Sequence, residues 1–175
     1  MSETATLAGG CFWCLDAIFR QCKGVDSVAS GFSGGHVENP SYEQSHTMDT
    51  GHAEAVQITF NPEIISYETI LQIFWTTHDP TTLNRDGANV GPEYRSEIFY
   101  HDETQKNTAD KVLHNFAEQL WEKPIVTKIS KFKNFYPAED YHQDYFNKNQ
   151  SAGYCQVIIN PKLAKFQEKF ADYLV

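Results

Sequence analysis

The chain has 175 residues, enough for a single domain over 1–175 with a sizeable buried core. Apolar residues make up 41 % and charged residues 21 %, as in an ordinary globular protein. The formal net charge of −9 argues against partners that are themselves anionic, so we expect neither nucleic acid nor a membrane surface to bind.

The sequence carries no pattern typical of export or membrane insertion. Its first residues lack a basic segment followed by an apolar one, and no stretch approaches the roughly 18 apolar residues of a membrane span. We therefore expect a cytoplasmic protein whose four cysteines are thiols. Because no heptad or repeated surface occurs, we also expect a monomer.

The motif Gly9-Gly10-Cys11-Phe12-Trp13-Cys14 joins a predicted strand to a predicted helix. An apolar run precedes it, and apolar residues recur after it at helical spacing. This order puts Cys11 at a helix N-terminus, where unpaired N–H groups and the helix dipole stabilise an anion. A thiol in that position tends to have a lowered pKa and to react as a thiolate. Phe12 and Trp13 would form an aromatic wall, so we expect a nucleophilic cysteine facing a small, partly apolar pocket.

Strands, helices and two long polar loops alternate along the rest of the chain. We predict a helix that ends near Gly24, a strand over 25–33, a loop over 36–51, a strand over 56–60, a helix capped by Ser66 and a loop over 79–92. There follow a strand over 96–100, a helix capped by Asp102, a strand over 125–129, a polar helix over 141–149, a strand over 155–159 and a last helix. The interleaving predicts an α/β or α+β sandwich, without giving the strand order.

The four cysteines differ in what their positions predict. Cys22 falls on the apolar face of the first helix, where a small buried hydrophobe is expected. Cys14 lies three residues after Cys11, so the two thiols could meet. Cys155 is either a core residue or a mobile thiol that reaches the pocket. The Cys-x-x-Cys spacing favours a thioredoxin-like dithiol, but bulky Phe12 and Trp13 between the cysteines count against it.

Glu54 is the carboxylate best placed to act as a general acid. It lies where the first long loop enters a strand, and a carboxyl beside aromatic rings can hold its proton near neutral pH. A strand-edge glutamate in water would have the same sequence pattern. Tyr42 and Tyr94, in the first loop and after the second, are candidate hydrogen-bond donors. We predict no metal site, because the histidines of the first loop have no second ligand cluster at short spacing.

An ordered series of motifs over nearly the whole chain resembles the A-type peptide methionine sulfoxide reductases. The series comprises GGCFWC at 9–14, GFSGG at 31–35, GHAE at 51–54, DPTTLNR at 79–85, YRSEIFYH at 94–101, EDYHQDYF at 139–146 and YCQVIINPKLAKF at 154–166. The resemblance implies a two-layer α/β sandwich with a mixed sheet and a plait-like core. It also implies that the two long loops close over a substrate pocket.

The resemblance further implies thiol-dependent reduction of the S-epimer of methionine sulfoxide, protein-bound or free. The roles it implies are Cys11 as nucleophile, Glu54 as general acid, Tyr42 and Tyr94 as donors to the sulfoxide oxygen, and Phe12 and Trp13 as the site of the substrate methyl group. Cys11 would become a sulfenic acid and then a disulfide, which thioredoxin would reduce. No metal or organic cofactor is implied.

Two positions depart from the pattern of that family. Asn89, a candidate substrate-binding residue, stands where the family usually has an aspartate, and we expect a modest effect. Cys14 stands where many members have glycine, so the resolving thiol is either Cys155, which we favour, or Cys14. The competing functions are a Cys11–Cys14 dithiol–disulfide oxidoreductase and a non-enzymatic module that binds oxidised methionine.

Overall fold

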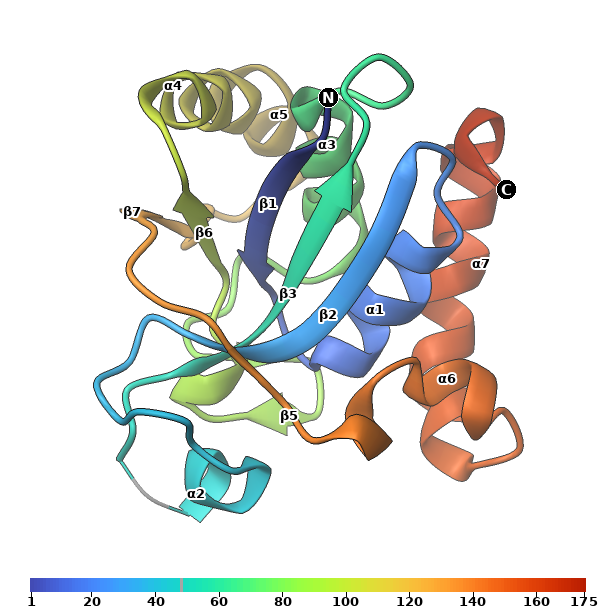
Figure 1. The fold of residues 1–175 in the computed structure, drawn as a ribbon. Coiled ribbons are helices and arrows are strands. Elements are labelled where there is room, and N and C mark those ends of the chain that lie inside the picture. Colours follow the sequence, from blue (N-terminus) through green and yellow to red (C-terminus); the bar gives the residue numbers. More distant parts are fainter. Residues whose placement is uncertain (48) are drawn as a thin grey trace.

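A sheet with helices packed on one face forms the centre of the computed structural model, which describes residues 1–47 and 49–175 (Figure 1). The central elements are β1 (Glu3–Ala8), α1 (Phe12–Arg20), β2 (Val25–Ser33), β3 (Ala53–Phe60), α3 (Tyr67–Thr77) and β6 (Glu97–Tyr100). Their spatial order is β6-β1-β3-β2, the arrangement of a plait in which two strand–helix–strand units are interleaved.

Two further strands extend the sheet to the order β7-β6-β1-β3-β2-β8. β7 (Lys128–Lys131) runs parallel to β6, whereas β8 (Tyr136–Pro137) and the central strands pair antiparallel. The sheet is therefore mixed, and the predicted two-layer α/β class is confirmed. The second long loop contains a separate small hairpin, β4 (Arg85–Asp86) with β5 (Asn89–Val90).

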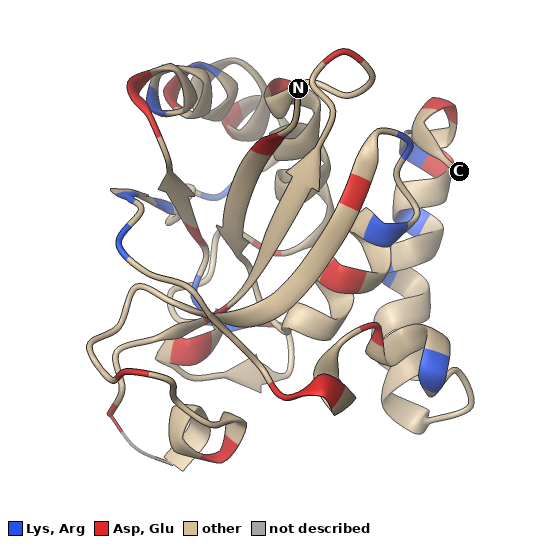
Figure 2. Cartoon of the chain, viewed as in Figure 1, with Lys and Arg blue, Asp and Glu red and all other residues tan. Residues whose placement is uncertain are grey.

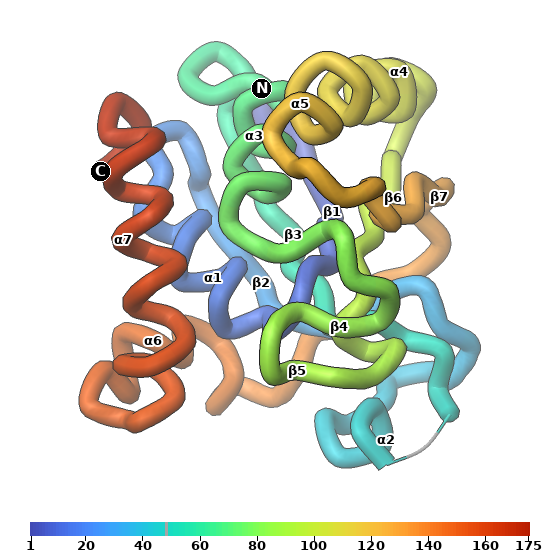
Figure 3. The backbone as a smooth tube through the Cα atoms, turned by 180° about the vertical axis from the view of Figure 1, so that it is seen from behind, coloured from blue at the N-terminus to red at the C-terminus, as the bar shows by residue number. Residues whose placement is uncertain are grey.

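The core lies between the sheet and the helices α1, α3 and α7 (Asn160–Lys169), which lie behind the sheet in Figure 1 and in front of it in Figure 3. Its largest fully buried side chains include Trp75, Phe12, Phe19, Phe60, Phe74 and Phe166. The opposite face of the sheet has a smaller apolar cluster of Ala8, Ala53, Ala55 and Phe99 under Phe132 and Phe135. Aromatic side chains thus supply much of the buried core.

The remaining helices lie at the edges of this sandwich. They are α2 (Tyr42–Thr47), α4 (Glu103–Val112) continued by a π-helical turn (Leu113–Ala117) and α5 (Glu118–Leu120), and α6 (Tyr145–Lys148). The predicted caps are confirmed: the side chains of Ser66 and Asp102 accept from the backbone N–H groups of Thr69 and Gln105. Acidic positions are spread over the fold, whereas lysines recur along α7 and β7 (Figure 2). Within the described residues, no helix is both long and apolar enough to cross a bilayer.

The strand predicted over 155–159 is wrong. Cys155–Ile159 is a π-helical turn that continues into α7. Its β-branched residues have the composition of a strand, but the buried positions recur at helical spacing, at Cys155, Ile159, Leu163 and Phe166. Packing of that face against the core therefore overrides local β propensity.

Other elements differ from the prediction in extent. α1 ends at Arg20, earlier than expected, because Cys22 already forms a β-bridge with Leu174. β7 starts later than residue 125, because Val126 N–H donates to the carbonyl of Pro80. The loop over 36–51 contains α2, the loop over 79–92 contains the β4–β5 hairpin, and the helix predicted over 141–149 shortens to α6 after a 3-10 turn at Asp140–His142.

Gly10 occupies a backbone conformation that a larger residue would strain. Its φ is +82°, and a Cβ there would lie 2.9 Å from Cβ and Cγ of Asp86. We expect Gly10→Ala to lower the free energy of unfolding by about 1–3 kcal/mol, through backbone strain and this contact. Urea denaturation measures the change.

Gly153→Ala is the matched control, because Gly153 has no positive φ and no atom within 4 Å of an added Cβ. We expect it to change the stability by less than about 0.5 kcal/mol. Equal losses in the two variants would contradict the role assigned to Gly10.

Candidate active site

Cys11 lies at the N-terminus of α1, where the sequence predicts it. It precedes the first residue of the helix and its exposed fraction is 4 %. Its carbonyl accepts from the N–H of Cys14 at 3.1 Å. The N–H of Phe12 donates instead to Oε1 of Glu54 at 3.0 Å, so a carboxyl group from β3 caps this helix.

Glu54 is completely buried, which excludes the alternative of a strand-edge glutamate in water. Its second oxygen, Oε2, lies 2.6 Å from Nε2 of His46 on α2. Burial raises the pKa of Glu54, while the contacts with His46 and with the N–H of Phe12 offset part of that rise. The carboxyl group therefore keeps its proton to a higher pH than a glutamate in water.

Tyr42 and Tyr94 approach Glu54 and Cys11 from the two long loops. Tyr42 begins α2, and Tyr94 ends a 3-10 turn at Pro92–Tyr94. Burial followed by the charge of Glu54 raises the pKa of both hydroxyl groups. Both phenols are therefore protonated at neutral pH and can donate hydrogen bonds.

Trp13 is held in a stack of rings beside this pocket. Its ring lies 3.8 Å from that of Tyr145 at an interplanar angle of 8°, and its Nε1 donates to Nδ1 of His142 at 3.0 Å. Phe12 is fully buried against Phe32, with ring centroids 5.6 Å apart. The aromatic wall predicted from the motif is thus present, and His142 and Tyr145, which the sequence analysis did not single out, complete it.

The pKa of Cys11 moves in the opposite direction to the one expected. Burial raises it well above the ordinary value, and a hydrogen bond to Cys14 and the charge of Glu54 add to the rise. The prediction of a lowered pKa is wrong because the N–H of Phe12 is already bonded to Glu54, whose charge opposes that of a thiolate. The resting thiol of Cys11 is therefore protonated.

Cys14 is buried beside Cys11, and its pKa is lowered. The hydrogen bond from Cys11 is the main cause, burial opposes it, and the charge of Lys162 contributes further. Lys162 forms an ion pair with Asp86. The hydroxyl of Tyr154 lowers the pKa of both thiols.

Cys155 and Cys22 have different surroundings. Cys155 is fully buried, and burial followed by the charge of Cys14 raises its pKa. The turn Cys155–Ile159 that carries it packs against α1. Cys22 is a core residue, as predicted, with its pKa raised to about 12 by burial. All four cysteines are free thiols in the structure.

Asn89 reaches the site only indirectly. It lies on β5, and its Nδ2 donates to the hydroxyl of Tyr154 at 3.0 Å. Tyr154 in turn contacts the thiols of Cys11 and Cys14. Asn89 is therefore placed to orient Tyr154.

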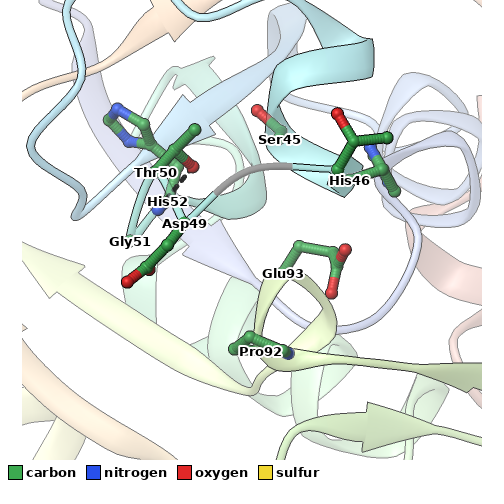
Figure 4. Close-up of a pocket in the computed structure, with 9 residues that line it drawn as sticks. Ser45, His46, Asp49, Thr50, Gly51, His52, Pro92 and Glu93 are labelled. Carbon is green, nitrogen blue, oxygen red and sulfur yellow. Dashed lines mark hydrogen bonds between the residues drawn. The ribbon is translucent and has the colours of Figure 1, made fainter.

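A cavity of about 390 Å³ borders His46, the residue bonded to Glu54 (Figure 4). Ser45 and His46 form one side, Pro92 and Glu93 the opposite side, and residues of the segment after α2 close the rest. Among residues 1–47 and 49–175, no three or more His, Cys, Asp or Glu side chains are grouped to hold a metal ion.

A family model described as peptide methionine sulfoxide reductase matches residues 3–174. The chain belongs to this family. A relative named peptide methionine sulfoxide reductase MsrA, from Chromobacterium violaceum, is 51 % identical over 173 residues, 98 % of each chain. The reductase is thus of the A type, an oxidoreductase that reduces methionine sulfoxide.

Solved structures agree with this assignment. Reduced Mxr1 from Saccharomyces cerevisiae superposes on the reductase with a TM-score of 0.83 at 32 % identity, covering 88 % of this chain and 89 % of that one. Mxr1 in complex with Trx2 superposes with a TM-score of 0.60 at 26 % identity, covering 82 % and 84 %.

The charge of Glu54 should control how readily Cys11 ionises. We expect Glu54→Gln to lower the pKa of Cys11, so that iodoacetamide alkylates Cys11 about three- to tenfold faster at pH 8. Mass spectrometry of the Cys11 peptide follows the rate. Glu43→Gln, which removes an exposed carboxylate from α2, is the control and should leave the rate unchanged. Equal rates for wild type and Glu54→Gln would refute this electrostatic account.

Proposed function

We propose that this reductase converts the S-epimer of methionine sulfoxide, free or protein-bound, to methionine through thiol chemistry at Cys11. The observation that carries the proposal is the buried carboxyl group of Glu54, bonded to the N–H of Phe12 directly after Cys11. A buried carboxyl is a proton donor near neutral pH, and a sulfoxide oxygen must gain a proton as its sulfur is attacked.

In the first step, the sulfur of Cys11 attacks the sulfoxide sulfur while Glu54 protonates the oxygen. Tyr42 and Tyr94 donate hydrogen bonds to that oxygen as negative charge develops on it. The sulfoxide S–O bond breaks and the oxygen ends on Cys11 as a sulfenic acid. The bond formed between the two sulfurs breaks as the oxygen moves to Cys11, so that Cys11 loses two electrons and the substrate sulfur gains them. The sulfenic acid carries the proton that Glu54 gave to the oxygen, and the thiol proton of Cys11 leaves to water.

Protonation of Glu54 assists the reaction in two ways. A neutral Glu54 no longer opposes the thiolate of Cys11, and it is also the form that can donate a proton. The protonated carboxyl group therefore favours formation of the Cys11 thiolate and also activates the sulfoxide for attack.

The substrate methyl group is proposed to contact Phe12 and Trp13. Aromatic faces and edges attract the polarisable sulfur and the apolar carbon beside it. The stack on Tyr145 and the hydrogen bond to His142 hold the indole of Trp13 in one orientation. Asn89 contributes by orienting Tyr154.

Two thiols are candidates to resolve the sulfenic acid, and we propose a relay that uses both. Cys14, hydrogen-bonded to Cys11, condenses with the sulfenic acid to give a disulfide and water. Cys155, which the family resemblance favours, then attacks the sulfur of Cys14 and releases Cys11 as a thiol. The packing of the turn Cys155–Ile159 against α1, the helix that carries Cys14, supports this order.

An external dithiol must reduce the final disulfide. We propose thioredoxin, because the related Mxr1 is known in complex with Trx2. The scheme uses no metal or organic cofactor. We propose that the reductase is a monomer and that it acts in the cytoplasm, where thioredoxin keeps thiols reduced.

Removal of the acid should distinguish the reductase from a simple dithiol oxidoreductase. We expect Glu54→Gln to slow methionine formation from the S-sulfoxide at least about hundredfold, the usual contribution of a general acid. Chromatography that separates the two epimers of the remaining methionine sulfoxide, with thioredoxin and its reductase as electron source, measures how fast each epimer is consumed.

A Cys11–Cys14 dithiol oxidoreductase would instead reduce insulin disulfides and would not depend on Glu54. Full sulfoxide reduction by Glu54→Gln, or equal use of the R-epimer by the wild type, would overturn the proposed mechanism.

A further inference from the structure

His46 makes two short polar contacts that together define its protonation. Its Nδ1 lies 2.7 Å from the backbone carbonyl of Tyr42, and its Nε2 lies 2.6 Å from Oε2 of Glu54. A carbonyl oxygen can only accept, so Nδ1 carries a hydrogen. Nε2 is therefore protonated only in the imidazolium form.

The contact between Nε2 and Oε2 requires one proton between the two atoms. Either an imidazolium donates to a carboxylate, or the carboxylic acid donates to a neutral imidazole. Oε1 of Glu54 is engaged by the N–H of Phe12, so Oε2 is the oxygen that exchanges the proton. His46 and Glu54 therefore hold one proton jointly.

The two partners differ in their access to water. The side chain of Glu54 is 0 % exposed, whereas that of His46 is 18 % exposed and borders the cavity between α2 and Pro92–Glu93 (Figure 4). A proton from solvent can thus reach Glu54 through the imidazole of His46.

We propose that His46 is a positioning residue. It receives protons from the cavity and keeps Glu54 supplied with the proton that Glu54 delivers to substrate. The inference rests on the proposed function of Glu54 as general acid. The shared proton passes from Nε2 to Oε2 and on to the sulfoxide oxygen, which leaves Glu54 as a carboxylate. His46 is then neutral, and water in the cavity returns the proton.

The groups that face His46 come from three other segments and from α2 itself. Glu54 approaches from β3, Glu93 and Tyr94 from the 3-10 turn, and His142 from the segment before α6, while the ring of Tyr42 stacks on the imidazole at 4.1 Å. Burial alone would lower the pKa of His46, but the bonds to Glu54 and to the Tyr42 carbonyl and the charges of Glu54 and Glu93 raise it overall. The charge of His46 in turn lowers the pKa of His142.

The expected signature is a pH-dependent defect in the variant His46→Gln. Glutamine keeps a hydrogen-bonding group near Oε2, but its amide does not take up and release a proton as an imidazole does. Near pH 6 a carboxyl group can still be protonated alone, so we expect single-turnover methionine formation within about threefold of wild type. Near pH 8 we expect a loss of about thirtyfold or more, because the pair no longer retains its proton.

The measurement is single-turnover methionine formation without external reductant, taken as the ratio of variant to wild type at each pH. The ratio removes the effects of pH that are common to the variant and the wild type. His114→Gln is the matched control: His114 bonds to Glu118 at 2.7 Å, but this pair is exposed and lies at the α5 end of the molecule, opposite α2 in Figures 1 and 3. We expect a ratio near one at both pH values for the control.

The same fractional loss at pH 6 and pH 8, or no loss at either, would overturn the inference. If His46→Gln does not fold, the wild type and Glu54→Gln suffice. Nitrogen NMR of the His46 ring should then show a midpoint above the ordinary ~6.5 in the wild type and a fall of about one pH unit or more in Glu54→Gln. Equal midpoints in these two proteins would also overturn it.

Failure of the proposed function gives a different result. If the wild type forms no methionine, or Glu54→Gln forms it at the wild-type rate, the general-acid mechanism itself is wrong. If the wild type is active and Glu54→Gln is not, a pH-independent ratio for His46→Gln rejects only the role of His46.

Discussion

The hydrogen bond from the N–H of Phe12 to Oε1 of Glu54 is the contact on which the site depends. It ties the start of α1 to the middle of the sheet and places a carboxyl group directly beside the reactive thiol. A carboxylate there is stabilised by the helix N-terminus, yet burial raises its pKa. The same burial, together with the charge of Glu54, raises the pKa of Cys11. The protonation of Glu54 therefore governs acid and nucleophile together.

The plait supplies rigid positions for Cys11 and Glu54, while the connections supply the groups around them. Cys11 follows β1 and Glu54 lies on β3, two strands that pair over Glu3–Leu7. Tyr42 and His46 come from α2, and Tyr94 comes from the turn before β6. This division places the reacting groups on the sheet and at the start of α1, and the hydrogen-bond donors on the connections around them.

The sequence was sufficient for the fold class, for Cys11 at a helix start and for a candidate acid at Glu54. It failed where tertiary packing determines the secondary structure or the pKa of a residue. The β-branched run after Cys155 is helical because one face packs on the core. The pKa of Cys11 is raised because the thiol is buried and because the charge of Glu54, which takes the free N–H of α1, opposes a thiolate. The bond from His46 to Glu54 joins two elements that antiparallel pairing of β2 with β3 brings together. Spacing along the chain carries no signal for such a contact.

The proposed chemistry requires that burial raises the pKa of Glu54, so that its carboxyl group carries a proton for the substrate. Titration of Glu54 itself tests this requirement. Carbon NMR of selectively labelled glutamate, with Glu54→Gln to assign the signal, follows the carboxyl carbon of Glu54 as the pH changes. The account predicts a midpoint above the ~4.3 of a glutamate in water. The sign follows from burial, which disfavours the charged form more than the bonds to Phe12 and His46 favour it. A midpoint at or below ~4.3 would contradict the account, because Glu54 would then be an ordinary carboxylate with no proton to give.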